Sequence, residues 1–260
     1  MTVVTRPSEG KTDAPHARSA LFLSVDPAQV FRFLCLGIVV LLGLHVTTMA
    51  ARMAHLGSMG RFVRLFDLDT EANVPTFYAV LQLACAALLL MVIGLNARQR
   101  SVGFARHWLM LGVVFTFLSL DELAHVHESL SGTIRRSLHV EGLLHFAWVI
   151  PYGVLTAIIG LAYLRFLMHL PPRTRRLIVF SALLYVGGAI GMELYGGYLY
   201  TRLDAVGRGA NPVYMTEVLV EEGMEMFGSA LFIYTLLDYL QGVAGRVQIA
   251  IGARSGRSPP

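Results

Sequence analysis

The sequence is poor in charged residues. Only 15% of its 260 residues are Asp, Glu, Lys or Arg, against about 25% in an ordinary soluble domain. Hydrophobic residues make up 55% of the chain, and the mean hydropathy is +0.60. Such a composition favours lipid over water as the solvent of most of the chain.

Cysteine is also scarce. Cys35 and Cys85 are the only two, and both lie within apolar stretches. Two isolated thiols provide neither a disulfide framework nor a zinc knuckle, so they are predicted to be core thiols. No basic stripe interleaved with aromatic residues is present, which argues against nucleic acid as a partner.

Six stretches are long and apolar enough to cross a bilayer, which takes about 20 helical residues. They are residues 30–50, 76–97, 104–127, 143–167, 177–200 and 214–240. The predicted fold is therefore all-α: a polytopic integral membrane protein whose six transmembrane helices form one bundle over residues 29–242. Residues 1–28 are predicted to be a disordered cytoplasmic tail, and residues 243–260 a flexible cytoplasmic tail.

The distribution of basic residues predicts the orientation. Fourteen of the 21 Lys and Arg residues fall in the two tails, in the connections after the second and fourth spans, or within the first or last few residues of the adjoining spans. The remaining seven fall in the other three loops. The positive-inside rule places both termini in the cytoplasm. The predicted location is the inner (cytoplasmic) membrane of the cell, crossed several times.

The third span ends in an unusual polar segment. On a continuous helix, Asp121, His125 and Glu128 share one face. Glu122 and His125 have the Glu-x-x-His spacing by which helical bundles present a carboxylate and an imidazole to a metal. His127 points away from this face unless the helix ends before it.

Carboxylates also lie in the fifth and sixth spans. Glu193 is an isolated acid of the fifth span, whereas Glu217, Glu221 and Glu225 form a stripe on the sixth, with Glu222 on its flank. The predicted topology brings these five acids and the three of the third span to the extracytoplasmic side. Segments 117–128, 187–197 and 217–228 contain no Lys or Arg. Buried charge is costly in a bilayer, so protons, a water-filled vestibule or bound cations must compensate it.

Carboxylates with a few imidazoles suit iron, manganese or zinc. The sequence predicts a centre of one or two such metals near the outer face. Glu221 is the candidate proton shuttle, and the candidate metal ligands are Asp121, Glu122, His125, His127, Glu128, Glu193, Glu222, Glu225 and His145. The Asp67, Asp69 and Glu71 alternation is similar to a calcium loop but lacks the glycine and the distal glutamate, which favours an interfacial turn.

Three segments carry a resemblance to a known group. Residues 66–76 (FDLDTEANVPT), 118–128 (LSLDELAHVHE) and 221–228 (EEGMEMFG) resemble those of an uncharacterised family of bacterial multi-pass membrane proteins. The similarity covers most of the membrane part and implies no known activity. In that group the positions matching Asp121, Glu122, His127 and Glu128 are constant, which implies His127 as the alternative ligand to His125 if the helix unwinds near its end.

The predicted function is that of a metal-dependent oxidoreductase or hydrolase acting on a lipidic or other hydrophobic small molecule. The chain lacks the His-x-x-x-His clusters of desaturase-like enzymes and the paired histidines of alkaline-ceramidase-like hydrolases. The alternatives are a transporter coupled to protons or divalent cations, a b-type cytochrome that uses two of His45, His125 and His145, and a structural membrane subunit. The oligomeric state stays open.

Overall fold

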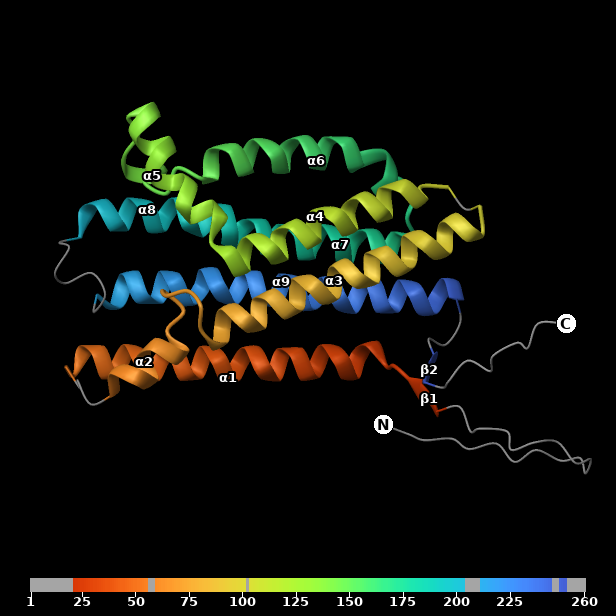
Figure 1. Ribbon diagram of the computed structural model, residues 1–260, viewed down its shortest axis with the longest axis horizontal. Coiled ribbons are helices and arrows are strands. Elements are labelled where there is room, and N and C mark those ends of the chain that lie inside the picture. The colour runs from red at the N-terminus through yellow and green to blue at the C-terminus, as the bar shows by residue number, and fades with distance from the viewer. Residues whose placement is uncertain (1–20, 56–58, 102, 204–210, 245–247, 252–260) are drawn as a thin grey trace, which may run out of the picture.

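The computed structural model describes residues 21–55, 59–101, 103–203, 211–244 and 248–251. The long helices lie side by side in one bundle, with β1 and β2 at one end and α2 and α5 at the other (Figure 1). The elements in chain order are β1 (Leu21–Ser24), α1 (Pro27–Met53), α2 (Gly60–Phe66), α3 (Val74–Gln99), α4 (Ala105–Ala124), α5 (Val126–Leu138), the 3-10 turn η2 (Gly142–Leu144), α6 (Val149–His169), α7 (Pro172–Val186), the π-helical turn η3 (Gly187–Met192), α8 (Glu193–Arg202), α9 (Pro212–Ala244) and β2 (Gln248–Ile251).

Five helical segments are long and apolar enough to cross a membrane. They are α1, α3, α4, α6 and the continuous run Pro172–Arg202 formed by α7, η3 and α8. The helical, membrane-type architecture predicted from the sequence is thereby confirmed. α9 is longer than any of these, at 33 residues, but carries four glutamates in its first half. The count of six spans and the orientation of the termini stay predictions.

A short pair of strands lies within the regions predicted to be tails. β1 and β2 pair as antiparallel strands, with Leu21 opposite Ile251 and Ser24 opposite Gln248. Residues 1–20 and 252–260 lie outside the described residues. The two strands are the first and last described elements, and they lie at the end of the bundle opposite α2 and α5 (Figure 1).

The third span does not continue as one helix to residue 127, so that prediction was wrong. α4 ends at Ala124 and α5 begins at Val126, because His125 adopts the left-handed conformation with φ of 52°. The carboxylate of Asp121 accepts a hydrogen bond from the backbone N–H of His127 at 3.0 Å, which satisfies a free donor in the first turn of α5. Because of this break, the His127 side chain lies against Asp121, whereas that of His125 lies against Glu71.

The fourth span also begins later than predicted. Residues 142–144 form a 3-10 turn, and the helix starts at Val149 in place of residue 143. α6 makes few close backbone approaches to the other described elements. By contrast, α9 packs closely on α1, α3, α7 and η3, and therefore forms the centre of the bundle.

The loop between α2 and α3 is held down by buried polar groups. The Asp67 side chain is fully buried and forms an ion pair with Arg52 of α1. His45 is also fully buried, and its Nδ1 accepts a hydrogen bond from the backbone N–H of Leu68 at 3.0 Å. The Asn73 amide donates to the carbonyl oxygens of Asp67 and Thr70, each at 2.6 Å. These contacts fix the segment that carries Asp69 and Glu71.

Replacing Asn73 by alanine is expected to destabilise the fold by about 1–2 kcal/mol, since Asn73 is the N-cap of α3 and its Oδ1 accepts from Thr76 N–H. Asn73→Asp retains the cap acceptor but places a carboxylate oxygen against the two carbonyl oxygens that the amide now donates to, so its loss should be at least as large. Thermal unfolding of the two variants in detergent measures the order. Equal stability of Asn73→Ala and the wild type would contradict the assigned role.

Candidate functional site

A cavity of about 670 Å³ lies inside the bundle between α4, α6, the α7–η3–α8 run and α9. Its polar end is lined by one imidazole, His127, and by ten carboxylates: Asp69, Glu71, Asp121, Glu122, Glu128, Glu193, Glu217, Glu221, Glu222 and Glu225. No Lys or Arg occurs among the described residues that line it. The lining toward the other end is mainly apolar and aromatic, and includes Leu111, Phe115, Ile159, Phe166, Ile178 and Phe232.

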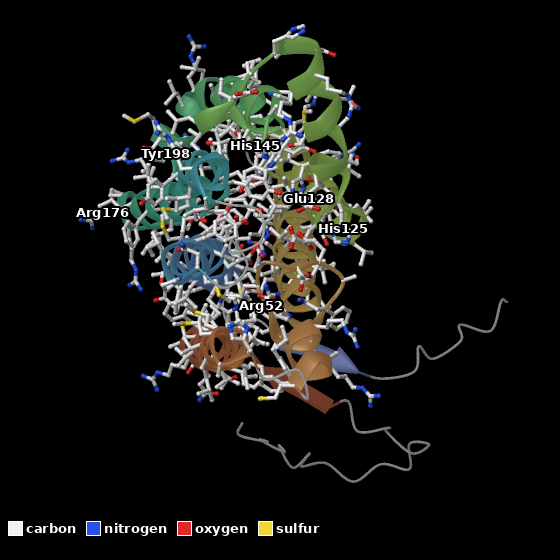
Figure 2. All side chains as sticks on the ribbon, turned by 90° about the vertical axis from the view of Figure 1, so that its left-hand side faces the viewer. Arg52, His125, Glu128, His145, Arg176 and Tyr198 are labelled. Atoms are coloured by element: carbon white, nitrogen blue, oxygen red, sulfur yellow. The ribbon has the colours of Figure 1, made fainter. Side chains whose placement is uncertain are left out.

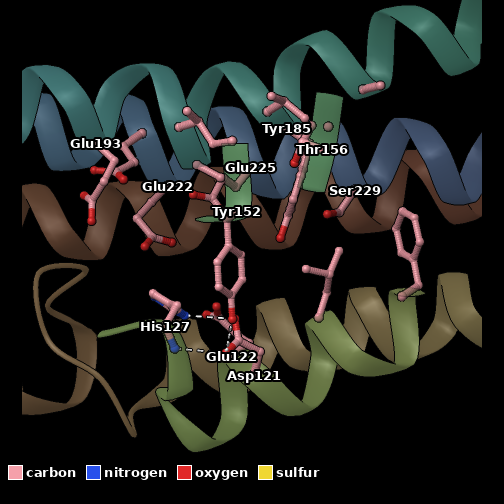
Figure 3. Close-up of a pocket in the computed structure, with 18 of the residues that line it drawn as sticks. Asp121, Glu122, His127, Tyr152, Thr156, Tyr185, Glu193, Glu222, Glu225 and Ser229 are labelled. Carbon is pink, nitrogen blue, oxygen red and sulfur yellow. Dashed lines mark hydrogen bonds and ion pairs between the residues drawn. The ribbon is translucent and has the colours of Figure 1, made fainter. Parts of the chain in front are cut away.

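The structure brings together all eight acids that the sequence placed on one side of the membrane. Figure 3 shows Asp121 and Glu122 of α4 on one side of the cavity and Glu193, Glu222 and Glu225 on the other. Asp69 and Glu71, from the loop before α3, complete the set of ten. Acidic faces that were predicted on three separate helices thus meet around one cavity.

One hydrogen-bonded group is built around Asp121, which is 5% exposed. Its Oδ2 lies 3.0 Å from Nδ1 of His127, and the Tyr152 hydroxyl donates to its Oδ1 at 3.0 Å (Figure 3). Burial lowers the pKa of His127, but the hydrogen bond and the charge of Asp121 outweigh burial, so that the pKa is raised overall. This arrangement holds an imidazole at the cavity wall in a fixed orientation.

A second group lies at the outer edge of the polar end. Ligand atoms of Glu71, His125 and Glu128 all lie within 4.8 Å of one another, and His125 Nδ1 is 3.1 Å from Glu71 Oε2. Figure 2 shows His125 and Glu128 close to each other when the bundle is viewed from this end. Burial raises the pKa of Glu71, and repulsion from Glu128 raises it further. Two carboxylates and one imidazole in this geometry match the ligand set of a divalent metal.

Deeper in the cavity the carboxyl groups contact one another. Glu221 lies close enough to Glu193 and Glu217 to interact with both, and neighbouring carboxylates repel one another unless a proton or a cation lies between them. Glu193 also accepts a hydrogen bond from Trp148 Nε1 at 2.7 Å. Glu217 is 4% exposed, and its Oε1 has no hydrogen-bond partner. The charge of this part of the cavity therefore requires compensation by protons or cations.

Of the nine predicted ligands, eight lie in or beside the cavity and one does not. Seven of the nine line the cavity, namely Asp121, Glu122, His127, Glu128, Glu193, Glu222 and Glu225, while His125 joins Glu128 and Glu71 at its edge. His145 does not line the cavity; its Nε2 lies 2.7 Å from Nη1 of Arg135. Its ring also lies 4.4 Å from that of Tyr200.

Several site residues were not predicted from the sequence. Glu71 was considered only as part of a calcium-like loop, whereas Trp148, Tyr152 and Tyr185 were not considered as cavity residues. Tyr152 and Trp148 flank Pro151 at the start of α6, at the same end as the acids. Their position at the predicted depth of the acids was the signal that could have identified Trp148 and Tyr152 as cavity residues.

The fold and the cavity define a helical protein of membrane type with an acid-lined internal chamber. Residues 33–240 match the family described as a domain of unknown function, DUF8692, and because this match spans most of the sequence, the chain belongs to that family. Comparisons with curated proteins and with solved structures gave no match.

Proposed function

We propose that the protein is a metal-dependent enzyme of the membrane, an oxidoreductase or hydrolase that acts on a lipidic substrate within the bundle. In this proposal six helices cross the inner membrane, both termini are cytoplasmic and the acids face the extracytoplasmic side. The observation that carries it is the cavity itself, in which the described lining joins ten carboxylates, without any Lys or Arg, to a largely apolar compartment. Bound cations would supply the missing positive charge.

Glu71, His125 and Glu128 are proposed to hold the first metal, which would be iron, manganese or zinc. A second metal would be held by acids that face one another across the cavity, Glu122 from α4 and Glu193, Glu222 and Glu225 from the opposite wall (Figure 3). When bound, such metals activate dioxygen or lower the pKa of a water molecule.

The remaining polar groups are proposed to move protons. His127 lies against Asp121 and faces the cavity, so it is placed to accept or donate a proton at a substrate atom. Asp121 orients His127, since both of its oxygens already have partners on His127 or Tyr152. Glu221, between Glu193 and Glu217, is the proposed proton shuttle to the interior of the cavity.

Metal analysis of the full-length protein, purified in detergent without chelator, tests this function. We expect about one or two metal ions per chain in the wild type. Metal affinity should fall at least tenfold in Glu128→Gln and His125→Ala, and metal content should fall in Glu222→Ala. Glu141→Gln alters an exposed acid outside the cavity lining and should retain the metal. A wild-type protein that neither contains nor takes up Fe, Mn or Zn would overturn the proposal.

A cation-coupled transporter is the second candidate. It is favoured by the closeness of Glu221 to Glu193 and Glu217, which places a row of carboxyl groups along the cavity. Reconstitution into vesicles separates the two functions. Transport predicts uptake of protons or Mn²⁺ into vesicles that Glu221→Gln abolishes, whereas the enzyme predicts tightly bound metal and no flux.

A further inference from the structure

We infer that the cavity selects amphiphiles with a positively charged amine headgroup, whose chain lies in the apolar compartment and reaches it from the side at α6. That such an amphiphile is a substrate rests on the proposed function. Its binding is measured independently of the metal. Two features on different parts of the lining carry the inference: the charge and an unsatisfied oxygen at the polar end, and the shape and composition of the apolar end.

The polar end disfavours an anionic headgroup. Ten acids line it, whereas no Lys or Arg of the described lining faces it, so a phosphate would meet like charges at short range. Two divalent metals would offset only part of this charge. Glu217 lines the cavity, and its Oε1 is buried without a hydrogen-bond partner. An ammonium group, which has three hydrogen-bond donors and no acceptor, satisfies such an oxygen.

The apolar compartment ends in a tight group of aromatic rings. Phe166 lines the cavity, and its ring lies 4.8 Å from that of Trp108 and 5.6 Å from that of Tyr163. The Tyr163 hydroxyl donates to the His107 carbonyl oxygen at 2.9 Å, so its polar atom is already satisfied. What remains along this wall is hydrocarbon and aromatic carbon, which suits an alkyl chain.

The α6 helix provides the side entrance. It approaches the other described elements closely at few positions, yet Thr156, Ile159, Gly160 and Tyr163 of α6 line the cavity. Gly160 is at once exposed and part of the lining. An added Cβ at Gly160 meets no heavy atom of another element within 4 Å, so the space beside this position is open. A chain in the bilayer can therefore reach the compartment past α6.

Quenching of tryptophan fluorescence by brominated chains tests the inference. The chain contains only two tryptophans: Trp148 lines the polar end, and Trp108, 2% exposed, lies against Phe166 beyond the apolar end. The probes are ω-bromo-undecylamine, ω-bromo-undecanol and ω-bromo-undecyl phosphate, added to the full-length, chelator-treated protein in an uncharged detergent. We expect the amine to quench Trp108, followed alone in a Trp148→Phe variant, at a concentration at least tenfold lower than the phosphate requires.

Two variants of α6 locate the site. Gly160→Phe fills the compartment and should weaken quenching by the amine at least tenfold, whereas Ala157→Phe places the same ring at an exposed position that does not line the cavity and should leave quenching unchanged. Equal quenching by amine and phosphate, or no effect of Gly160→Phe, would overturn the inference. Metal content decides the proposed function separately, because amine binding to a protein that holds no metal would retain this inference and reject the enzyme.

Discussion

Replacing Arg52 by glutamine is expected to lower the free energy of unfolding by about 3–5 kcal/mol. Asp67 is fully buried, and Arg52 is its ion-pair partner. Removal of one member of a buried ion pair leaves an uncompensated charge, which costs much more than the pair itself contributes. Unfolding in detergent, followed by circular dichroism against temperature, measures the loss.

A double-mutant cycle provides the control. Asp67→Asn together with Arg52→Gln removes the stranded charge, so the double variant should be more stable than Arg52→Gln alone. Arg64→Gln changes an exposed arginine near the same end and should remain within about 0.5 kcal/mol of the wild type. If Arg52→Gln and Arg64→Gln unfold at the same temperature, the buried pair does not hold the loop.

Replacing Gly228 by alanine is expected to force α7 and α9 apart. The added Cβ would lie 2.7 Å from the backbone nitrogen of Tyr185 and 3.0 Å from the carbonyl oxygen of Ser181. Backbone atoms cannot rotate away as a side chain does, so the cost should be about 1–3 kcal/mol or more. Because Gly228, Ser181 and Tyr185 all line the cavity, the shape of the cavity should change as well.

Gly223 offers a matched control on the same helix. A Cβ at that position meets only the Leu42 side chain, at 3.6 Å, which is ordinary van der Waals contact. Alanine favours a helix over glycine by about 1 kcal/mol, so Gly223→Ala should be neutral or stabilising. Opposite signs of the two changes in unfolding temperature are the predicted result, and destabilisation of similar size by both would show that helix separation is not the cause.

The convergence of acids was predictable because it depends on topology. In an antiparallel bundle, the third and fifth predicted spans end on the same side of the membrane. The sixth span begins on that side, because it follows the fifth. Asp121, Glu193 and Glu217 must then lie at one depth, whatever the packing details are. Hydropathy and charge patterning supply that count directly from the sequence.

The local geometry was not predictable in the same way. A 100° periodicity assumes an unbroken helix, and it favoured His125 over His127 as the neighbour of Asp121. The left-handed His125 breaks the helix, and the Asp121 side chain compensates by capping α5. Short polar side chains compete with the helix for backbone donors, and a single sequence does not show which side prevails. The resemblance had pointed to His127.

The pairing of Glu71 with His125 could not be predicted for a different reason. Their contact, 3.1 Å between Oε2 and Nδ1, joins a loop to a helix break more than 50 residues away. Its position is set by the buried anchors Asp67 and His45, whose partners come from other parts of the fold, and by Asn73, which closes the loop on itself. Periodicity places residues on faces of an element but does not position a loop between elements.

The most direct test of a cation-compensated cavity is an anomalous difference map from crystals of the full-length protein grown with Mn²⁺. The proposed function predicts a peak at about 2 Å from ligand atoms of Glu71, His125 and Glu128, and its loss in crystals of Glu128→Gln. A map with no manganese anywhere along the acid-lined wall, from protein saturated with the ion in solution, would contradict the central claim.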